Sequence, residues 1–472
     1  MKPFSTILFV LLLACIPAIG AGAVEPYIWE DRDGVVHISD DPPASPATVK
    51  EIIEQPSPAP RAGNSSSGRH TDFLIENGIK YRVVNNYARW VSLLYEEKDF
   101  TALEKHIDGL LKANNEAKSC ELYHLYTNLA ELHPDLAGNR QQQVLDEWCG
   151  RSPDSHIPWL VRGWFLISRA WEIRTARPAK DVPPEAWPRF RAKLREALSD
   201  LEKARSVYRY DPNVSCFLIT VAMGLSSPRE RMEEYFHNGI AIWPWHGPLY
   251  SAKLLYLMPK WHGSLPEMFA FAEACLALSE QYPSVGFVML EALNEIDKKN
   301  QEKEIFCEKG AWNMTHQVLT NFFTRYPDDL RRRFYYAYYA YKAKQFNIAA
   351  EQFGIIGDRW MGDTCWSSLS RYNRSRAFAY YKKGEDLLWK KNQGTKAIDC
   401  FQRALQYNPT ANAWYGLGMA YWHDAARQED TALLKRVEES LEKALLITPD
   451  HEPAQKQLGN IRDTLRRVAA DG

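Results

Sequence analysis

The stretch that decides the fold is ANAWYGLGMAYW, residues 411–422, near the carboxy-terminal end of the sequence. Three of its large apolar residues and one glycine follow the spacing i, i+3, i+4 and i+7, and these are Trp414, Leu417, Gly418 and Tyr421. Residues at that spacing lie on one face of a helix. A glycine on an otherwise bulky face predicts close approach of a second helix. The stretch therefore predicts a helical hairpin.

This stretch resembles the first helix of a tetratricopeptide repeat, whose signature contains Trp-x-x-Leu-Gly-x-x-Tyr. The second-helix pattern of that family falls on Val437, Leu441, Ala444 and Pro449. The sequence departs from the family by seven extra residues, around 425–431, which predicts a longer turn between the two helices. Weaker matches lie upstream, one with Gly384, Ala397, Phe401, Ala404 and Pro409 and one with Phe346, Ala349, Phe353 and Ile356. The resemblance implies an α-solenoid of tetratricopeptide-like helix hairpins, closed after Pro449 by a capping helix.

Prolines divide the rest of the chain into units of similar length. They are Pro212, Pro244, Pro283, Pro327, Pro409 and Pro449, with separations of 32, 39, 44, 82 and 40 residues, and 82 is two units of 41. Proline ends one helix and lets the next hairpin begin. The sequence therefore predicts a mostly α protein, with degenerate helical hairpins at 72–328 and tetratricopeptide-like repeats at 329–472.

A second resemblance lies within the degenerate region. Residues 257–276, LMPKWHGSLPEMFAFAEACL, resemble the family called domain of unknown function 4034 through Pro259, Trp261, Gly263, Ser264, Met268 and Phe271. His262 departs from the family pattern, in which a glycine is usual. The resemblance implies a family domain over roughly 85–300 and brings no known chemistry.

The first 23 residues have the order of a secretory signal peptide, with Lys2, an apolar run at 7–14 and small residues at 21–23. Ala-Gly-Ala before Val24 fits an ordinary signal peptidase. Leu-Leu-Ala before Cys15 instead resembles a bacterial lipobox, and cleavage there leaves a lipid anchor at Cys15. Both interpretations predict export, as a free periplasmic protein or as a lipoprotein anchored at the membrane. No later apolar run reaches ~18 residues, so no transmembrane segment is expected in the mature chain.

Residues 24–43 predict a small β-hairpin module. Two β-rich runs, 27–30 and 35–39, flank an Asp-Arg-Asp-Gly turn, and a double proline follows the second run. The segment resembles the amino-terminal module called domain of unknown function 4124 through Tyr27, Trp29, Asp33, Gly34, Val36, His37, Ser39, Asp41, Pro42 and Pro43. The resemblance implies a bacterial envelope address and no activity. Residues 44–71, rich in Pro, Ser and Gly, predict a flexible linker, and the tethered module is either a ligand-binding element or a spacer.

The composition argues against several classes of partner. With 58 basic and 59 acidic residues the formal net charge is −1, which indicates neither nucleic acid nor anionic lipid. The 16 tryptophans and 24 tyrosines predict helix interfaces filled with aromatic rings. The eight cysteines lack metal-binding spacing, so neither a metal nor a cofactor is expected. Cys120 and Cys149 open and end successive predicted helices, which predicts a disulfide at one end of an antiparallel hairpin.

The sequence contains no serine-hydrolase, zinc-peptidase or phosphate-loop motif. Glu439-Ser440, the one Glu-Ser pair, lies within a predicted repeat helix and is interpreted as solvated surface. Two Trp-His-Gly segments suggest an alternative ligand site, made of Trp245, His246, Trp261 and His262. If these four residues face one another across a hairpin, they suit an envelope glycan-processing enzyme or a glycan-binding accessory. If they only anchor loops, they bind no ligand.

The leading interpretation is a non-enzymatic scaffold or adaptor that binds a peptide or protein of the bacterial envelope in the solenoid groove. The resemblance to tetratricopeptide arrays implies the groove residues Arg331, Phe334, Tyr338, Tyr341, Lys342, Phe378, Tyr381, Trp389, Asn412, Tyr415, Met419, Trp422 and His423. The two-Lys, two-Asn pattern that grips a terminal carboxylate in that family is absent. An extended or helical peptide with apolar anchors and an acidic residue is expected. The alternative is that neighbouring helices or the amino-terminal hairpin cover these side chains.

Overall fold

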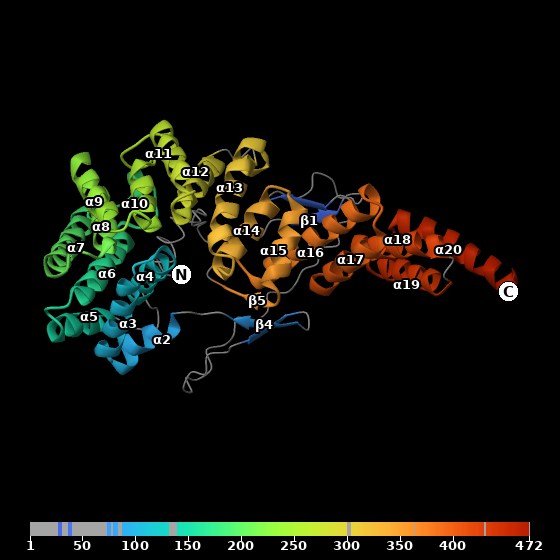
Figure 1. Cartoon of the computed structure of the whole chain (residues 1–472), viewed down its shortest axis with the longest axis horizontal. Helices are drawn as coiled ribbons and strands as arrows, with labels where there is room; N and C mark the ends of the chain where they lie inside the picture. Colours follow the sequence, from blue (N-terminus) through green and yellow to red (C-terminus); the bar gives the residue numbers. More distant parts are fainter. Residues whose placement is uncertain are drawn as a thin grey trace. The chain divides into compact units, whose positions relative to one another are not determined.

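The computed structural model describes residues 27–30, 36–39, 73–76, 79–83, 87–131, 139–299, 304–362, 364–428 and 431–471. It is mainly helical, and helices that follow one another in the chain pack against each other in pairs (Figure 1). The chain divides into two compact units between Gln345 and Phe346, one helix later than the predicted boundary at 328. Of the helices in the described ranges, none combines the length and apolar character of a membrane span.

The first unit, Asn85–Gln345, is helical throughout its described part. Its elements are α2 (Ala88–Ser92), the π-helical η1 (Leu93–Glu97), α3 (Phe100–Ala113), α4 (Glu116–Leu129), α5 (Arg140–Arg151), α6 (His156–Arg174), η2 (Ala179–Asp181), α7 (Ala186–Val207), α8 (Pro212–Leu225), α9 (Arg229–Ile242), α10 (Gly247–Leu257), α11 (Leu265–Leu278), η3 (Pro283–Gly286), α12 (Phe287–Lys299), η4 (Ile305–Cys307), α13 (Lys309–Arg325) and α14 (Leu330–Lys342). Polar side chains cap several of them: Asp99 accepts a hydrogen bond from the Ala102 N–H at 3.0 Å to start α3, and Asp329 does the same for α14.

Aromatic rings fill the interfaces between these helices, as the composition predicts. Trp164 of α6 stacks on Phe217 of α8 with 4.4 Å between ring centroids, and both are buried. Trp171 meets Phe190 of α7 edge to face at 5.0 Å. Such pairs add a directional contribution to the area they remove from water. These rings hold α6, α7 and α8 together.

A buried carboxylate, Asp211, joins three helices of this unit. It caps α8, and its Oδ1 accepts hydrogen bonds from the backbone N–H and the side-chain amide of Asn213, at 2.9 and 2.8 Å. Its Oδ2 accepts from the Tyr126 hydroxyl of α4 at 2.7 Å and lies 3.2 Å from His156 Nε2 of α6. Burial acts to raise the pKa of Asp211, but the bonds from His156, Tyr126 and Asn213 outweigh burial and lower it. The group is therefore a charged structural junction.

A second buried carboxylate, Glu116, closes the unit over a long sequence separation. Its Oε1 accepts a hydrogen bond from the Ser284 backbone N–H at 2.5 Å. Its Oε2 accepts one from the Tyr326 hydroxyl at 2.8 Å and one from Arg325 at 3.3 Å. These partners follow Glu116 by 168 to 210 residues, so the first turn of α4 is anchored to η3 and to the end of α13.

The second unit joins Pro17–Val84 to Phe346–Gly472, and the latter range contains the repeats that carry the decisive stretch. Its helices are α15 (Phe346–Ile356), α16 (Leu369–Glu385), the π-helical η5 (Asp386–Lys390), α17 (Gly394–Tyr407), α18 (Ala411–Gln428), α19 (Thr431–Ile447) and α20 (Glu452–Asp471). Each of α16 to α19 packs on the next helix along the chain. Leu417, Leu441 and Ala444 are buried in their shared core. The predicted hairpin partners are thus confirmed for α18 and α19.

Two details refine the last hairpin. A Cβ atom placed on Gly418 would lie 3.4 Å from Ser440 and Leu441 of α19, an ordinary van der Waals distance, whereas one placed on Gly416 would lie 2.5 Å from Phe401 of α17, so the tight approach falls at Gly416 and not at the predicted Gly418. The extra residues do not form the predicted long turn, because α18 continues to Gln428 and α19 begins at Thr431. Alanine, arginine and glutamine are strong helix formers, and this explains why the insertion prolongs the helix.

The strands all belong to the second unit. In the segment where a hairpin is predicted, β1 (Tyr27–Glu30) pairs antiparallel with β2 (Val36–Ser39), with Tyr27 opposite Ser39. Further on, β3 (Phe73–Glu76) pairs antiparallel with β4 (Ile79–Val83), and β5 (Arg359–Trp360) adds to β4 in parallel. The prediction that the chain is helical from residue 72 is wrong here. The signal in the sequence was Asn-Gly at 77–78 between two β-rich runs, which is a strong hairpin signature.

Candidate functional site

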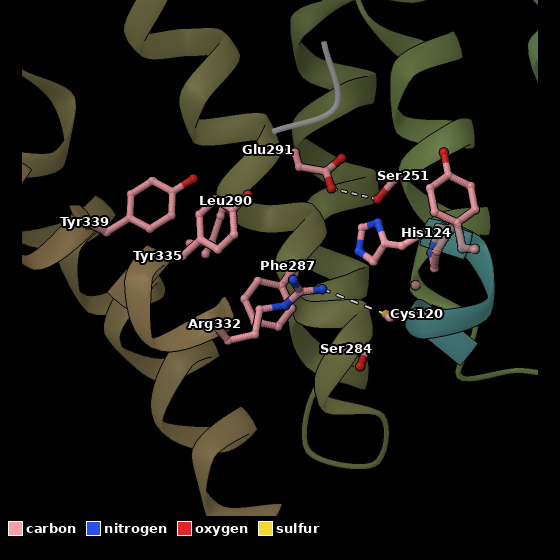
Figure 2. A pocket seen from close by; sticks show the side chains of 13 residues that line it. Cys120, His124, Ser251, Ser284, Phe287, Leu290, Glu291, Arg332, Tyr335 and Tyr339 are labelled. Carbon is pink, nitrogen blue, oxygen red and sulfur yellow. Dashed lines mark hydrogen bonds between the residues drawn. The ribbon is translucent and has the colours of Figure 1, made fainter. Parts of the chain in front are cut away.

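A cavity of about 50 Å³ lies inside the first unit, among α4, α10, α12 and α14 (Figure 2). Each helix contributes residues three or four apart, so each presents one stripe of its surface to the cavity. The lining consists of Cys120, Tyr123, His124, Gly247, Pro248, Ser251, Ser284, Phe287, Leu290, Glu291, Arg332, Tyr335 and Tyr339. The walls are largely aromatic and aliphatic, and a few polar groups converge on the space.

Glu291 is the acidic group of the cavity and is only 6% exposed. One carboxyl oxygen, Oε1, accepts a hydrogen bond from the Ser251 hydroxyl at 2.7 Å. The other, Oε2, is buried without a hydrogen-bond partner. Burial raises the pKa of Glu291 to about 8, against the smaller opposing effects of the Ser251 bond, Arg332 and Lys298. At neutral pH the side chain is therefore mainly a carboxylic acid that can donate a proton in a hydrogen bond.

Arg332 supplies the positive charge of the cavity. Its guanidinium lies 4.6 Å from the centroid of the Phe287 ring, a cation–π distance. One terminal nitrogen, Nη2, lies 3.8 Å from Cys120 Sγ, whereas the buried Nε has no hydrogen-bond partner. Figure 2 shows Arg332 and Glu291 reaching toward the same space from two different helices. The cavity thus combines one fixed cation with one protonated acid.

Two further titratable groups of the cavity, His124 and Cys120, are held in their neutral forms. Burial, reinforced by the charges of Arg331 and Arg332, lowers the pKa of His124 well below its ordinary value. Burial raises the pKa of the Cys120 thiol despite the opposing charge of Arg332. A protonated thiol beside a neutral imidazole is a poor nucleophile. The arrangement is suited to binding an acceptor group and supplies no activated nucleophile.

The four residues of the alternative ligand site have separate partners in the first unit. His246 is fully buried, and its Nδ1 lies 3.0 Å from Ser119 Oγ; burial lowers its pKa to about 4. His262 Nε2 lies 2.9 Å from the Met223 carbonyl oxygen. Trp245 lies beside Tyr282, with centroids 6.3 Å apart, and Trp261 meets Trp171 edge to face at 5.2 Å. These contacts agree with the loop-anchor interpretation.

The thirteen predicted groove residues are divided between the two units. Those of α14 lie in the first unit, where Phe334 is fully buried and Lys342 is paired with Asp297. Arg331, Tyr338 and Tyr341 are partly exposed there. The burial of Phe334 shows that its predicted groove-lining role is wrong. Tetratricopeptide spacing placed this side chain on an open face, whereas α14 turns it into the core.

In the second unit the predicted residues fall on α16, η5 and α18. Phe378 and Tyr381 adjoin each other with centroids 6.2 Å apart, and Tyr415 lies 5.3 Å from the His451 ring. His451 also bonds the Asn412 side chain at 3.0 Å. Met419 is 2% exposed and belongs to the core, so its predicted lining role is wrong for the same geometric reason as that of Phe334.

Trp389 and Trp422 remain accessible, at 57% and 43% exposed. Their segments are joined by a hydrogen bond between His423 Nε2 and the side-chain oxygen of Asn392, at 2.5 Å. His423 Nδ1 also lies 3.0 Å from Asp424 Oδ1. This connection fixes the loop after η5 against α18, so the two tryptophans are carried by neighbouring, mutually braced segments.

The predicted disulfide is not formed in the structure, and Cys120 and Cys149 are both free thiols. Cys120 turns toward Arg332 of α14, at 3.8 Å. Cys149, at the end of α5, is buried near Arg162 and Asp200, and burial raises its pKa to about 12. The two helices point these side chains at different neighbours, which the antiparallel-hairpin argument could not anticipate.

Comparison with known proteins gives two matches to protein families. The model of domain of unknown function 4124 matches residues 11–65, and the model of domain of unknown function 4034 matches residues 88–197. The second match ends before residues 257–276, the segment through which the resemblance was predicted, and it covers about half of the expected range. No curated protein matches the sequence. The chain thus joins regions similar to two domains of unknown function to a carboxy-terminal set of paired helices.

Proposed function

We propose that the protein is an exported, non-enzymatic scaffold that binds a peptide segment of another envelope protein through the second unit. The observation that carries this proposal is the pair of accessible tryptophans, Trp389 of η5 and Trp422 of α18, whose segments are joined by the bond between Asn392 and His423. Exposed tryptophan is uncommon on a surface that binds nothing, and tryptophan dominates the energetics of many interfaces. The paired helices resemble tetratricopeptide hairpins, and the proposal assigns them that family's mode of binding.

The surroundings of the tryptophans indicate the chemistry of the partner. Lys390 follows Trp389 and is 79% exposed, with its one ion pair to Asp386 at 3.3 Å. Lys382, farther back on α16, lies over the rings of Phe378 and Tyr381 at 5.6 and 5.4 Å. Lys382 is itself paired with Glu385 at 2.9 Å, so apolar anchors on the partner would cover the rings and an acidic residue would meet Lys390. A peptide with both features fits this surface best.

The proposed location is the bacterial periplasm. It rests on the signal-like order of residues 1–23 and on the match to domain of unknown function 4124 at residues 11–65. The first segment lies outside the described residues, and of the second only 27–30 and 36–39 are described. The mature chain is expected to begin at Val24. Intact-mass measurement of the exported protein tests this, since a chain beginning at lipidated Cys15 would replace a free periplasmic protein with an anchored one.

We favour a scaffold over a glycan-processing enzyme because His246 and His262 each have a hydrogen-bond partner within the first unit. Their aromatic neighbours Trp245 and Trp261 pack against different rings. A glycan site would instead place accessible rings and paired carboxylates around one cleft.

The experiment is photo-crosslinking in the periplasm with the double variant Trp389→Ala/Trp422→Ala. A crosslinkable residue at Tyr381 should capture a specific protein with the unaltered chain, and the double substitution should lower capture at least about tenfold. Leu446→Ala is the matched control, because Leu446 is 83% exposed but lies on the second helix α19. A peptide from the captured protein should then bind the purified chain. Equal capture by the double variant and the control would overturn the proposal.

A further inference from the structure

We infer that the cavity of the first unit is a binding site for a carboxylate group, carried by a small molecule or by the end of a larger one. This site is distinct from the peptide surface of the second unit and does not rest on the proposed function. The inference starts from two polar atoms, Glu291 Oε2 and Arg332 Nε, that line or border the cavity and have no hydrogen-bond partner. Native proteins rarely leave buried polar atoms unpaired, and two such atoms from different helices at one cavity point to a shared missing partner.

With Glu291 in its protonated form, both unpaired atoms are donors that require an acceptor. The Arg332 Nε–H can only donate. Glu291 Oε1 already accepts from the Ser251 hydroxyl, so the protonated form of the acid has its Oε2–H left to donate. The two donors belong to α12 and α14 and reach toward one space (Figure 2). A ligand with two acceptor oxygens satisfies both, and a guanidinium holds a planar carboxylate particularly well.

The charge of the cavity favours one negative charge on the ligand. The charged groups that act on Glu291 are Arg332 and Lys298, and both are positive. Glu295, one turn further along α12, is paired with Lys260 and Lys298. Among the lining side chains, Arg332 is therefore the cation that a ligand would neutralise, and a single carboxylate does so without excess charge.

The other groups coupled to Glu291 do not change charge near neutral pH. Tyr123 of α4, Cys216 of α8 and Cys275 of α11 each have a pKa raised mainly by burial. His124 is kept neutral by its lowered pKa. Between pH 7 and 9 the group that titrates in this environment is therefore Glu291. Its ionisation removes a donor and adds a repelling charge, so ligand binding must weaken over that interval.

The size of the cavity limits what can enter. About 50 Å³ is roughly a third of the ~150 Å³ cavity that accommodates benzene. A formate- or acetate-sized group fits this space, whereas a phosphate brings more charge and more atoms. Filling by ordered water alone is the competing outcome, since water also offers acceptors to both donors.

The test is titration of the full mature chain with ¹³C-labelled acetate, followed by NMR at pH 7 and pH 9. So small a ligand should bind with Kd of about 0.1–10 mM at pH 7, and at least about tenfold more weakly at pH 9. Acetamide, the neutral counterpart of acetate, and phosphate should each bind at least about tenfold more weakly than acetate at pH 7. A peptide ending in a free carboxylate, compared with its amidated form, shows whether the group also enters as the end of a longer chain.

Three variants locate the site. Glu291→Gln keeps a donor but cannot ionise, so its affinity for acetate should be the same at both pH values. Arg332→Gln should weaken binding at least about tenfold. Arg333→Gln is the matched control, because it removes the same charge from α14 at a residue whose guanidinium stacks on Phe323 at 3.6 Å instead of lining the cavity. Circular dichroism checks that each variant is folded.

Several results would overturn the inference. Acetate and acetamide binding equally well would show that no charge is recognised. Unchanged acetate affinity in folded Arg332→Gln would place binding elsewhere. Absence of binding to the unaltered chain, at acetate concentrations on the order of 50 mM, would assign the cavity to water.

Discussion

Replacing Glu116 should destabilise the first unit more than any comparable change on the surface of the same helix. Its side chain is 5% exposed and accepts hydrogen bonds from Ser284 N–H, the Tyr326 hydroxyl and Arg325, at 2.5, 2.8 and 3.3 Å. Glu116→Ala would leave a backbone donor and a hydroxyl without partners and Arg325 without its counter-charge. These donors belong to η3 and to the end of α13, so the change also frees two distant elements from α4.

The magnitude follows from these contacts. A hydrogen bond to a charged group contributes about 1.5–3 kcal/mol, but the three bonds share one carboxylate and do not add. Arg325 is half exposed, which reduces the contribution of the ion pair. Removing one partner of a buried charged network typically costs about 3–5 kcal/mol, and we expect the lower half of that range for Glu116→Ala. Glu116→Gln, which keeps an acceptor oxygen, should cost about 1–2 kcal/mol.

Differential scanning calorimetry measures the effect as a shift in the unfolding temperature of the first unit. For a unit of this size each kcal/mol corresponds to about 2–4 °C, so a loss of about 3–4 kcal/mol in Glu116→Ala should lower Tm by about 6–16 °C. Glu121→Gln, on the same helix but partly exposed and paired with Lys118, is the control and should change Tm by less than about 2 °C. Equal, small shifts for both variants would refute the view that Glu116 closes the unit.

Three further predictions concern other parts of the structure. The ordinary pKa of a glutamate is 4.5, and burial raises that of Glu291 to about 8, so in this pH window the folded chain retains a proton that the unfolded chain releases. The free energy of unfolding should therefore fall as pH rises through the window, and Glu291→Gln should flatten this slope in urea-unfolding curves. Equal slopes for the two chains would contradict the raised pKa. A Cβ on Gly394 would collide with Asp424, so Gly394→Ala should cost about 1–3 kcal/mol by urea unfolding, whereas Gly310→Ala, with open space around its Cβ, should cost little; equal costs would disprove the collision. Cys120 and Cys149 should both be alkylated when the chain is unfolded without reductant. Mass spectrometry that finds the two residues crosslinked would show that the disulfide forms after all.

The helical part of the fold was predictable because its signals are local. Apolar residues at i, i+3, i+4 and i+7 indicated the face of α18, and the same periodicity located α17 and α19. Local signals also led to two wrong predictions. The insertion after Ala425 was interpreted as a turn because it departs from a family pattern, although its residues favour helix. The strand pair at 73–83 was missed although Asn-Gly marked it.

Side-chain direction was predicted less well, since it depends on how a helix is rotated against several neighbours at once. Phe334 and Met419 were assigned to an open groove and are buried, whereas Trp389 and Trp422 are accessible as expected. A repeat pattern defines which residues share a face, but the rotation of a degenerate helix is decided by the volumes it packs against. The same reason separates Cys120 from Cys149.

The sequence by itself determined that this is a chain of paired helices with an export-like amino terminus, because helix periodicity, proline spacing and a signal-peptide order are each written within a few tens of residues. Only the tertiary structure decided that Cys120, Glu291 and Arg332 line one cavity and that Glu116 meets Tyr326. Those groups are up to 212 residues apart, and no local pattern couples them. The raised pKa of Glu291 has the same origin, since it arises from the burial that the convergence of α4, α10, α12 and α14 creates.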